Sequence, residues 1–420
     1  MAAETIDTLI IGGGQAGIAM SEHLSRHGIP HLVVEKDRIA EKWRTGRWDS
    51  LVANGPAWHD RFPNMSFEGI DPYAFAPKDR IVDYFEEYAR RIAMPIRTGV
   101  TVTSLTRLPD TRFRAETSAG IIEAQNVVSA TGPFQKPLIP AVIPTETGIF
   151  QTHSAGYRNP DQLPAGAVLV VGAGASGVQI ADELARAGKR VFLSVGPHDR
   201  PPIRYRGRDF VWWLGVLGKW DAPVRAPGTE HVTIAVSGAQ GGRTVDFREL
   251  AARGITLLGR TQAYENGELS FAPDLARNIE NGDRNYLSVL DEADAYLAAH
   301  GIDLPEDPRA RQIGPLPVSA TNPRLSLDLA AEDITAVVWA TGYGLDYGWL
   351  QVPGALDEKG RPDHDRGVAR VRGLYFVGLP WLSCRASAFI WGAWRDAAHL
   401  ADVIAARSAA SAQPTRAVLA

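Results

Sequence analysis

The sequence is short of cysteine and of long apolar runs. Cys384 is the only cysteine in 420 residues, which excludes an internal disulfide, a CxxC redox pair and a thiolate-rich metal cluster. No apolar run approaches the ~20 residues that a membrane-spanning helix needs, and the N-terminus lacks the basic and apolar stretches of a signal peptide. We therefore expect a cytoplasmic protein without a membrane span.

A surplus of charge is missing as well. The net charge is -4, with 45% hydrophobic and 22% charged residues, which is typical of soluble globular proteins and gives no basic surface for nucleic acid. His23 and His27 form a helical i, i+4 pair, but the HExxH pattern of zinc enzymes is absent. We therefore expect neither a nucleic-acid partner nor a bound metal.

Two stretches of the chain share one outline. They are IIGGGQAGIAMSEHLSRHGIPHLVVEKD at residues 10–37 and VVGAGASGVQIADELARAGKRVFLSVGP at residues 170–197. Each predicts a strand, a glycine turn, an amphipathic helix, a glycine stop and a second strand, which together form a βαβ unit. In the first copy the strands are expected at 5–11 and 31–35, and in the second at 167–171 and 190–195.

Both copies carry a GxGxxG turn between strand and helix, the context that makes this motif informative. The first glycine permits the tight turn, the second lets the backbone approach a pyrophosphate, and the third allows close packing of helix and strand. The diphosphate then lies at the positive end of the helix dipole. The predicted residues of the first turn are Gly12, Gly14, Gln15, Ala16 and Gly17, and those of the second are Gly172, Gly174, Ser176 and Gly177.

The two copies differ beyond the turn. Glu35, with Lys36 beside it, ends the second strand of the first copy and can accept hydrogen bonds from the ribose hydroxyls of an adenosine, whereas Val195 stands at the matching position of the second copy. The segment GPHDRPPIRYRGRD follows Val195, so its arginines can face a 2′-phosphate. We expect FAD at the first turn and NADPH at the second, with Ser194 and Arg200 as contacts; a solvated basic loop is the alternative for that segment.

At this point the chain resembles the flavin-containing monooxygenases, including their plant YUCCA-type and bacterial CzcO-like members, over residues 5–405. The resemblance implies an α/β fold of two Rossmann-like dinucleotide-binding domains, with a discontinuous FAD domain at 1–155 and 320–410, an NADPH domain at 156–319 and a flexible tail at 411–420. The ATG segments of this family link the two domains. The motifs that carry the resemblance add the cofactor-binding candidates Trp43, Arg44, Ala130, Thr131, Gly132, Ala340, Thr341, Gly342, Tyr343 and Gly378.

Asn54 matches the asparagine that this family places near the flavin edge, in the motif NGP at 54–56. The resemblance implies that its amide helps to preserve the oxygenated flavin; a plain asparagine turn is the alternative. The family's FxGxxxHxxx(W/Y) pattern is only partly met, because His153 and Tyr157 fit while Thr147 and Ile149 replace the phenylalanine and the first glycine. The choice between heteroatom oxygenation and Baeyer–Villiger oxidation therefore stays open, as does a contact between His153 and NADPH.

Three functions are compatible with these features. The first is an NADPH- and O2-dependent monooxygenase that acts on a small organic substrate through a C4a-(hydro)peroxyflavin. The second is a reductase that passes electrons to a quinone or a protein; a disulfide acceptor is excluded because EKWRTGRWD at 41–49 replaces the expected cysteine pair. The third is a non-enzymatic nucleotide-sensing subunit. A homodimer is the default for a chain of this size, and the aromatic segment 205–220 is either a substrate lid or interdomain packing.

Overall fold

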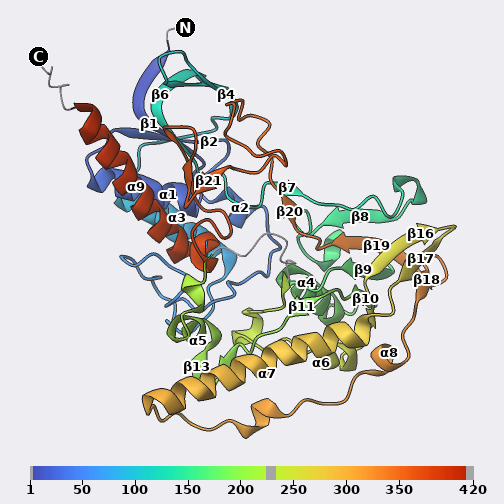
Figure 1. Cartoon of the computed structure of the whole chain (residues 1–420). Coiled ribbons are helices and arrows are strands. Elements are labelled where there is room, and N and C mark those ends of the chain that lie inside the picture. Colours follow the sequence, from blue (N-terminus) through green and yellow to red (C-terminus); the bar gives the residue numbers. More distant parts are fainter. Residues whose placement is uncertain (1–2, 224–232, 413–420) are drawn as a thin grey trace, which may run out of the picture.

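Two β-sheets organise the chain in the computed structural model, which describes residues 3–223 and 233–412 (Figure 1). The first sheet has the order β21-β22-β23-β6-β1-β2-β3 and is mixed: β5 pairs antiparallel with β6, β4 pairs antiparallel with β5, and β21 and β22 form antiparallel pairs at one edge. β1 pairs in parallel with β2 and β6, as a βαβ crossover requires. Its strands are β1 (Glu4–Ile11), β2 (His31–Glu35), β3 (Ile96–Thr98), β4 (Val102–Arg107), β5 (Phe113–Thr117), β6 (Gly120–Ser129), β21 (His364–Asp365), β22 (Val368–Ala369) and β23 (Leu374–Phe376).

Helices from both ends of the sequence cover one face of this sheet. α1 (Gln15–Arg26) packs against α9 (Ile390–Ala412), and these two helices lie side by side in blue and red in Figure 1. Small buried residues such as Ala19 and Ala397 let the two backbones approach closely. α3 (Lys78–Arg91) adds its aromatic side chains to the same core. The domain built on the first sheet is therefore discontinuous in sequence.

The second sheet has the order β15-β10-β9-β19-β8, and its described pairs are parallel. The central strand β9 reads AVLVV and is buried along its whole length, because helices cover one face of the sheet and the small sheet of β16, β17 and β18 covers the other. Its strands are β8 (Phe150–His153), β9 (Ala167–Val171), β10 (Val191–Ser194), β15 (Thr256–Leu258) and β19 (Ile334–Trp339), and its helices are α4 (Ala175–Arg186), α6 (Phe247–Ala252), α7 (Leu275–His300) and α8 (Val318–Thr321).

Strand pairing moves two elements relative to the predicted domain boundaries. The predicted limits at residues 155 and 320 would place β8 and β19 in the FAD domain, yet both pair within the second sheet. The chain crosses between the sheets directly after the ATG segments, where β7 (Lys136–Pro137) and β20 (Tyr343–Gly344) pair antiparallel. The two crossings therefore run side by side, at about residues 130–137 and 340–344.

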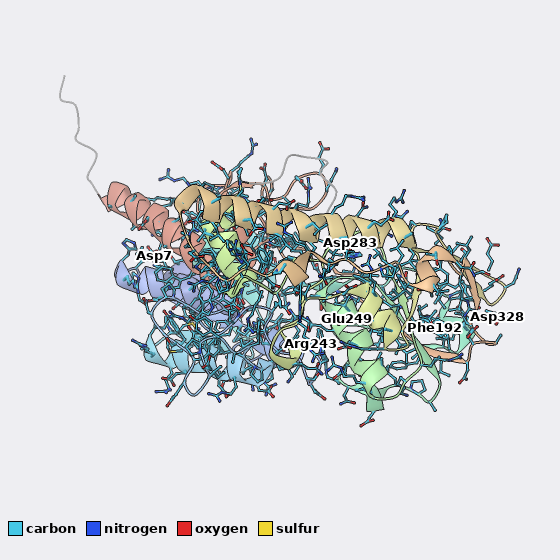
Figure 2. The ribbon with its side chains drawn as sticks, turned by 90° about the horizontal axis from the view of Figure 1, so that it is seen from below. Asp7, Phe192, Arg243, Glu249, Asp283 and Asp328 are labelled. Atoms are coloured by element: carbon cyan, nitrogen blue, oxygen red, sulfur yellow. The ribbon has the colours of Figure 1, made fainter. Side chains whose placement is uncertain are left out.

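The remaining elements lie around the second sheet. α7 runs along the molecule, and Asp7 of β1 lies at the opposite end from Phe192 of β10 and Asp328 of β18 (Figure 2). Of the predicted tail at 411–420, α9 takes in residues up to Ala412, and 413–420 lie outside the described residues. No helix within 3–223 or 233–412 is long and apolar enough to cross a membrane. The other elements are α2 (Glu41–Arg44), α5 (Phe210–Val216), β11 (His198–Asp199), β12 (Arg204–Tyr205), β13 (Arg208–Asp209), β14 (Thr233–Ile234), β16 (Thr261–Glu265), β17 (Glu268–Phe271) and β18 (Ser326–Asp328).

Candidate functional site

The first glycine turn is built for close backbone packing. Gly12 has φ = +118°, and a Cβ placed there would lie 2.5 Å from the carbonyl oxygen of Ala130. A Cβ on Gly17 would collide with the carbonyl oxygen of Gly12. Side chains are therefore excluded at both positions, and the first ATG segment lies directly against the turn.

Gly14, the middle glycine, faces open space instead. A Cβ placed on it would meet no atom within 4 Å, and the turn forms one wall of a cavity of about 350 Å³. A backbone that is exposed in this way at the start of a helix is suited to a phosphate. Eleven predicted residues line this cavity: Gly12, Gly14, Gln15, Ala16, Glu35, Lys36, Trp43, Ala130, Thr131, Gly132 and Gly378.

Glu35 links the end of β2 to the glycine turn. Its carboxylate accepts hydrogen bonds from the backbone N–H of Gly13 at 2.6 Å and of Asp37 at 2.9 Å. Each oxygen keeps further acceptor capacity, because an ionised carboxylate has about four lone-pair sites. The carboxylate can therefore hold the turn and accept from ribose hydroxyls at the same time.

Three cations line the same cavity: Lys36, Lys42 and Arg47. Burial, with the nearby charges of Lys36 and Arg47, lowers the pKa of Lys42 below its ordinary value. Such crowding of like charges is relieved when an anion binds between them. The residues at the first turn therefore fit a dinucleotide such as FAD.

The two arginines of this region are placed differently relative to the cavity. The predicted Arg44 is not among the lining residues, because its guanidinium pairs with Glu86 of α3 and approaches Glu41 at 3.9 Å. Arg47 lines the cavity instead, with its guanidinium 4.5 Å from the centre of the Phe134 ring. The only signal for it in the sequence was the RW pair that follows KWR.

The second glycine turn repeats the geometry of the first turn with one difference. Gly172 has φ = +118° and lies against the carbonyl of Ala340, and Gly177 lies against the carbonyl of Gly172. The space in front of Gly174, however, holds the hydroxyl of Thr233 in β14. The space in front of the second turn is therefore partly filled in this arrangement. Ser176 lies half-buried in the first turn of α4.

Ser194 and Arg200, the predicted 2′-phosphate contacts, have their polar atoms engaged elsewhere. Each is 2% exposed. Ser194 donates to the carbonyl of Gly259 and accepts from the N–H of Thr261. Arg200 forms a 2.7 Å ion pair with Asp283, which Figure 2 labels on α7. Neither side chain is available to a phosphate in this arrangement.

The other arginines of the basic segment also contact side chains of the protein. Arg204 pairs with Asp209 at 2.8 Å and Arg206 with Asp294 at 2.9 Å, while Arg208 lies 5.3 Å from the ring centre of Trp212. These partners come from the segment itself and from α7, which a local motif does not reveal. Preference for NADPH over NADH therefore stays a prediction.

Asn54 lies between the two domains. Its side chain is exposed, and its Oδ1 accepts a hydrogen bond of 2.9 Å from Nε2 of Gln179 in α4. It is not among the residues that line the large cavity. Its predicted catalytic role therefore stays a prediction, now with a defined contact to the NADPH domain.

His153 and Tyr343 hold the second ATG segment in place. Nε2 of His153 lies 2.9 Å from the carbonyl of Gly342, and its Nδ1 accepts from the N–H of Ala155. Burial lowers the pKa of His153, which favours this neutral form. The ring of Tyr343 lies 4.8 Å from His153 and 5.0 Å from Phe134, and Thr341 donates to the carbonyl of Leu138. His153 thus anchors an interdomain crossing.

Comparisons with known proteins agree with this architecture. Residues 9–206 match the family model described as pyridine nucleotide-disulphide oxidoreductase. The chain is 34% identical to an uncharacterized CzcO-like oxidoreductase of Geobacillus kaustophilus, over 95% of this chain and 98% of that protein. It is 26% identical to the indole-3-pyruvate monooxygenase YUCCA8 of Oryza sativa, over 92% and 91% of the two chains.

A solved flavin-containing monooxygenase of Stenotrophomonas maltophilia has the same fold, with a TM-score of 0.67, 18% identity, and coverage of 96% of this chain and 99% of that one. Because one relative exceeds 30% identity over nearly its whole length, the chain belongs to the CzcO-like oxidoreductases, and it is similar over most of its length to flavin-containing monooxygenases.

Proposed function

We propose that this chain uses FAD and NADPH to transfer one oxygen atom of O2 to a nitrogen, sulfur or carbonyl centre of a small organic substrate. The observation that carries the proposal is the pairing of an open FAD-type cavity at the first turn with a second glycine turn on a facing domain. One chain thereby holds a resident redox cofactor and an exchangeable hydride donor. Bound FAD would supply the redox chemistry, since a flavin can accept a hydride from NADPH and pass the two electrons to O2.

Different residues of the cavity are suited to bind different parts of FAD. The backbone of Gly12 and Gly14 faces the pyrophosphate, and Lys36 and Arg47 supply positive charge. Glu35 accepts from the ribose. Trp43 and Phe134 add apolar surface to the wall of the cavity, against which a flavin ring could pack.

Asn54 supplies the polar contact at the junction of the two domains. Its amide donates and accepts hydrogen bonds without titrating, so it can orient an oxygen without delivering a free proton. The bond from Gln179 engages Oδ1 and leaves the Nδ2 hydrogens to point toward a reacting group. We assign Asn54 as the catalytic residue of this proposal.

Anaerobic mixing with NADPH, followed by O2, tests the proposal. We expect the flavin absorbance to bleach with NADPH and to return with O2. With a panel of amines, thioethers and ketones, we expect oxygenated product in proportion to the NADPH consumed. A protein that stays colourless after incubation with excess FAD would contradict the proposal.

The family model that spans residues 9–206 also covers disulphide oxidoreductases, so the reductase alternative is measured in the same assay. Cys384 is the single cysteine and is buried, which leaves a quinone or a protein as the acceptor. Rapid NADPH oxidation with a quinone, without oxygenated product from any member of the panel, would favour that alternative.

A further inference from the structure

A chain of three hydrogen bonds leads from α9 to the loop that carries Asn54. The indole Nε1 of Trp391 donates to Nε2 of His59 at 2.9 Å. Nδ1 of His59 lies 2.7 Å from Oδ1 of Asp60. Oδ2 of Asp60 accepts from the backbone N–H of Gly55 at 3.0 Å, directly after Asn54.

The partners fix the direction of each bond. An indole N–H only donates, so Nε2 of His59 must be the unprotonated acceptor. Nδ1 of His59 then carries the hydrogen and donates a hydrogen bond to the carboxylate of Asp60. Each polar atom in this chain is thereby used once, and the imidazole has one tautomer.

Packing holds the same geometry. His59 is 8% exposed, and its ring stacks on Trp220 at 5.3 Å with a 25° interplanar angle. The edges of Trp58 and Trp391 face it at 5.5 and 5.7 Å. The carboxylate of Asp60 fills the space where a side chain at Gly55 would lie. The loop at residues 54–60 is therefore constrained from both sides.

One end of this chain borders the FAD-type cavity. Trp391 lies in the first turn of α9, three residues after Ala388, which lines the cavity and whose carbonyl accepts from Gln15 of α1. The other end is the peptide N–H that follows Asn54. The three bonds thus connect the start of α9, three residues beyond the cavity-lining Ala388, to the peptide group next to Asn54.

We propose that His59 is a positioning residue that, through Asp60, fixes the Asn54 loop relative to the FAD cavity. This inference rests on the proposed function of Asn54. His59 does not itself act on the substrate, because both of its ring nitrogens are bonded within the protein. Its effect is to reduce the conformational freedom of the 54–56 segment, so that the Asn54 amide keeps one orientation.

Two variants break the chain at different points. His59→Phe keeps an aromatic ring in the stack and removes both hydrogen bonds, while Trp391→Phe removes only the indole donor. Trp394→Phe is the matched control, because this tryptophan lies on the same helix and donates at 2.9 Å to Glu22, away from the loop. If His59→Phe does not fold, Trp391→Phe alone tests whether the hydrogen-bond chain positions the loop.

The first readout is hydrogen exchange of the peptide that contains Gly55, measured by mass spectrometry. Loss of one hydrogen bond is expected to speed this exchange by about tenfold in Trp391→Phe, with no change in Trp394→Phe. The second readout is the rate at which O2 restores the flavin absorbance of NADPH-reduced protein. We expect Asn54→Ala and His59→Phe each to accelerate it, and the double variant to match Asn54→Ala alone, because both changes act through one group.

The positioning role would be overturned if His59→Phe and Trp391→Phe both showed the exchange at Gly55 and the reoxidation rate of the wild type while Asn54→Ala reoxidised faster. That result would leave the proposed function intact. Additive effects in the double variant would also overturn it. A wild-type protein that NADPH does not reduce would instead contradict the proposed function, and Gly55 exchange would still report on the hydrogen-bond chain.

Discussion

At the scale of single residues, Arg44 and Arg47 give the sharpest contrast. They stand three positions apart, yet Arg44 is engaged by Glu86 and Arg47 lines the cavity. We expect Arg47→Ala to weaken FAD binding by about 10- to 100-fold, since a phosphate contact from a charged group is worth on the order of 1.5–3 kcal/mol. Titration of apoprotein with FAD measures this.

Arg44→Ala is the matched control for that experiment. It removes the same charge from the same region without touching the cavity wall, so the Kd for FAD is expected to stay within about twofold of wild type. An equal loss of affinity in both variants would mean that overall charge, and not the Arg47 contact, attracts the cofactor.

Glu35 allows a second prediction at this scale. In Glu35→Gln the amide would turn a donor toward one of two backbone N–H groups that now meet carboxylate oxygens. We expect the purified variant to carry less FAD, with a Kd raised by about 10- to 100-fold. The ratio of flavin absorbance to protein measures the loss, and Glu86→Gln, outside the cavity, serves as its control.

Residue identity in the first turn could be read from the sequence because local backbone geometry sets it. Gly17 meets the carbonyl of Gly12 in its own turn, and the positive φ of Gly12 belongs to the same tight turn, so the motif itself contains the reason for both glycines. Ser194 and Arg200 could not be read in this way. Their partners, Gly259 and Asp283, are distant in sequence, and only the fold brings them together.

At the scale of elements, β14 controls access to the second turn. The hydroxyl of Thr233 lies in the space in front of Gly174, whereas the space in front of Gly14 is open. We expect Thr233→Ala to lower the Kd for NADPH several-fold, because less of the binding energy is used to displace β14. Quenching of protein fluorescence by NADPH measures the change.

Ile234→Val is the control for Thr233, because consecutive strand residues point to opposite faces. An unchanged Kd in Thr233→Ala would show that the dinucleotide reaches the turn without moving this side chain.

Element types were largely predictable, while their membership in sheets was not. The periodicity gave β2 at His31–Glu35 and β9 at Ala167–Val171. The boundaries at 155 and 320 misplaced β8 and β19, because a buried parallel strand reads the same in either sheet. Only the pairing of Val337 with Leu169, far apart in sequence, decides where β19 lies.

At the scale of the whole molecule, a buried histidine couples stability to pH. His198 is 1% exposed, its Nδ1 lies 2.9 Å from the carbonyl of Gly196, and its Nε2 has no hydrogen-bond partner among the residues that the structure describes. Burial lowers the pKa of His198 to about 4, against roughly 6.5 in an unfolded chain. The folded state therefore resists protonation that the unfolded state accepts.

The sign of the effect follows from this difference. Above pH 6.5 both states are neutral and the full stability is present; as the pH falls toward 4, only the unfolded chain takes up the proton, so the free energy of unfolding decreases. One such histidine lowers the free energy of unfolding by about 1–3 kcal/mol over this window.

Burial also lowers the pKa of His23 to about 4, so His23 acts in the same direction. His198→Phe is therefore expected to reduce the pH dependence of the free energy of unfolding without abolishing it. Urea titrations at several pH values between 4 and 7 measure the slope. His300→Phe, at the exposed end of α7, is the control. An unaltered slope in His198→Phe would mean that carboxylates, and not this ring, set the acid limit of the fold.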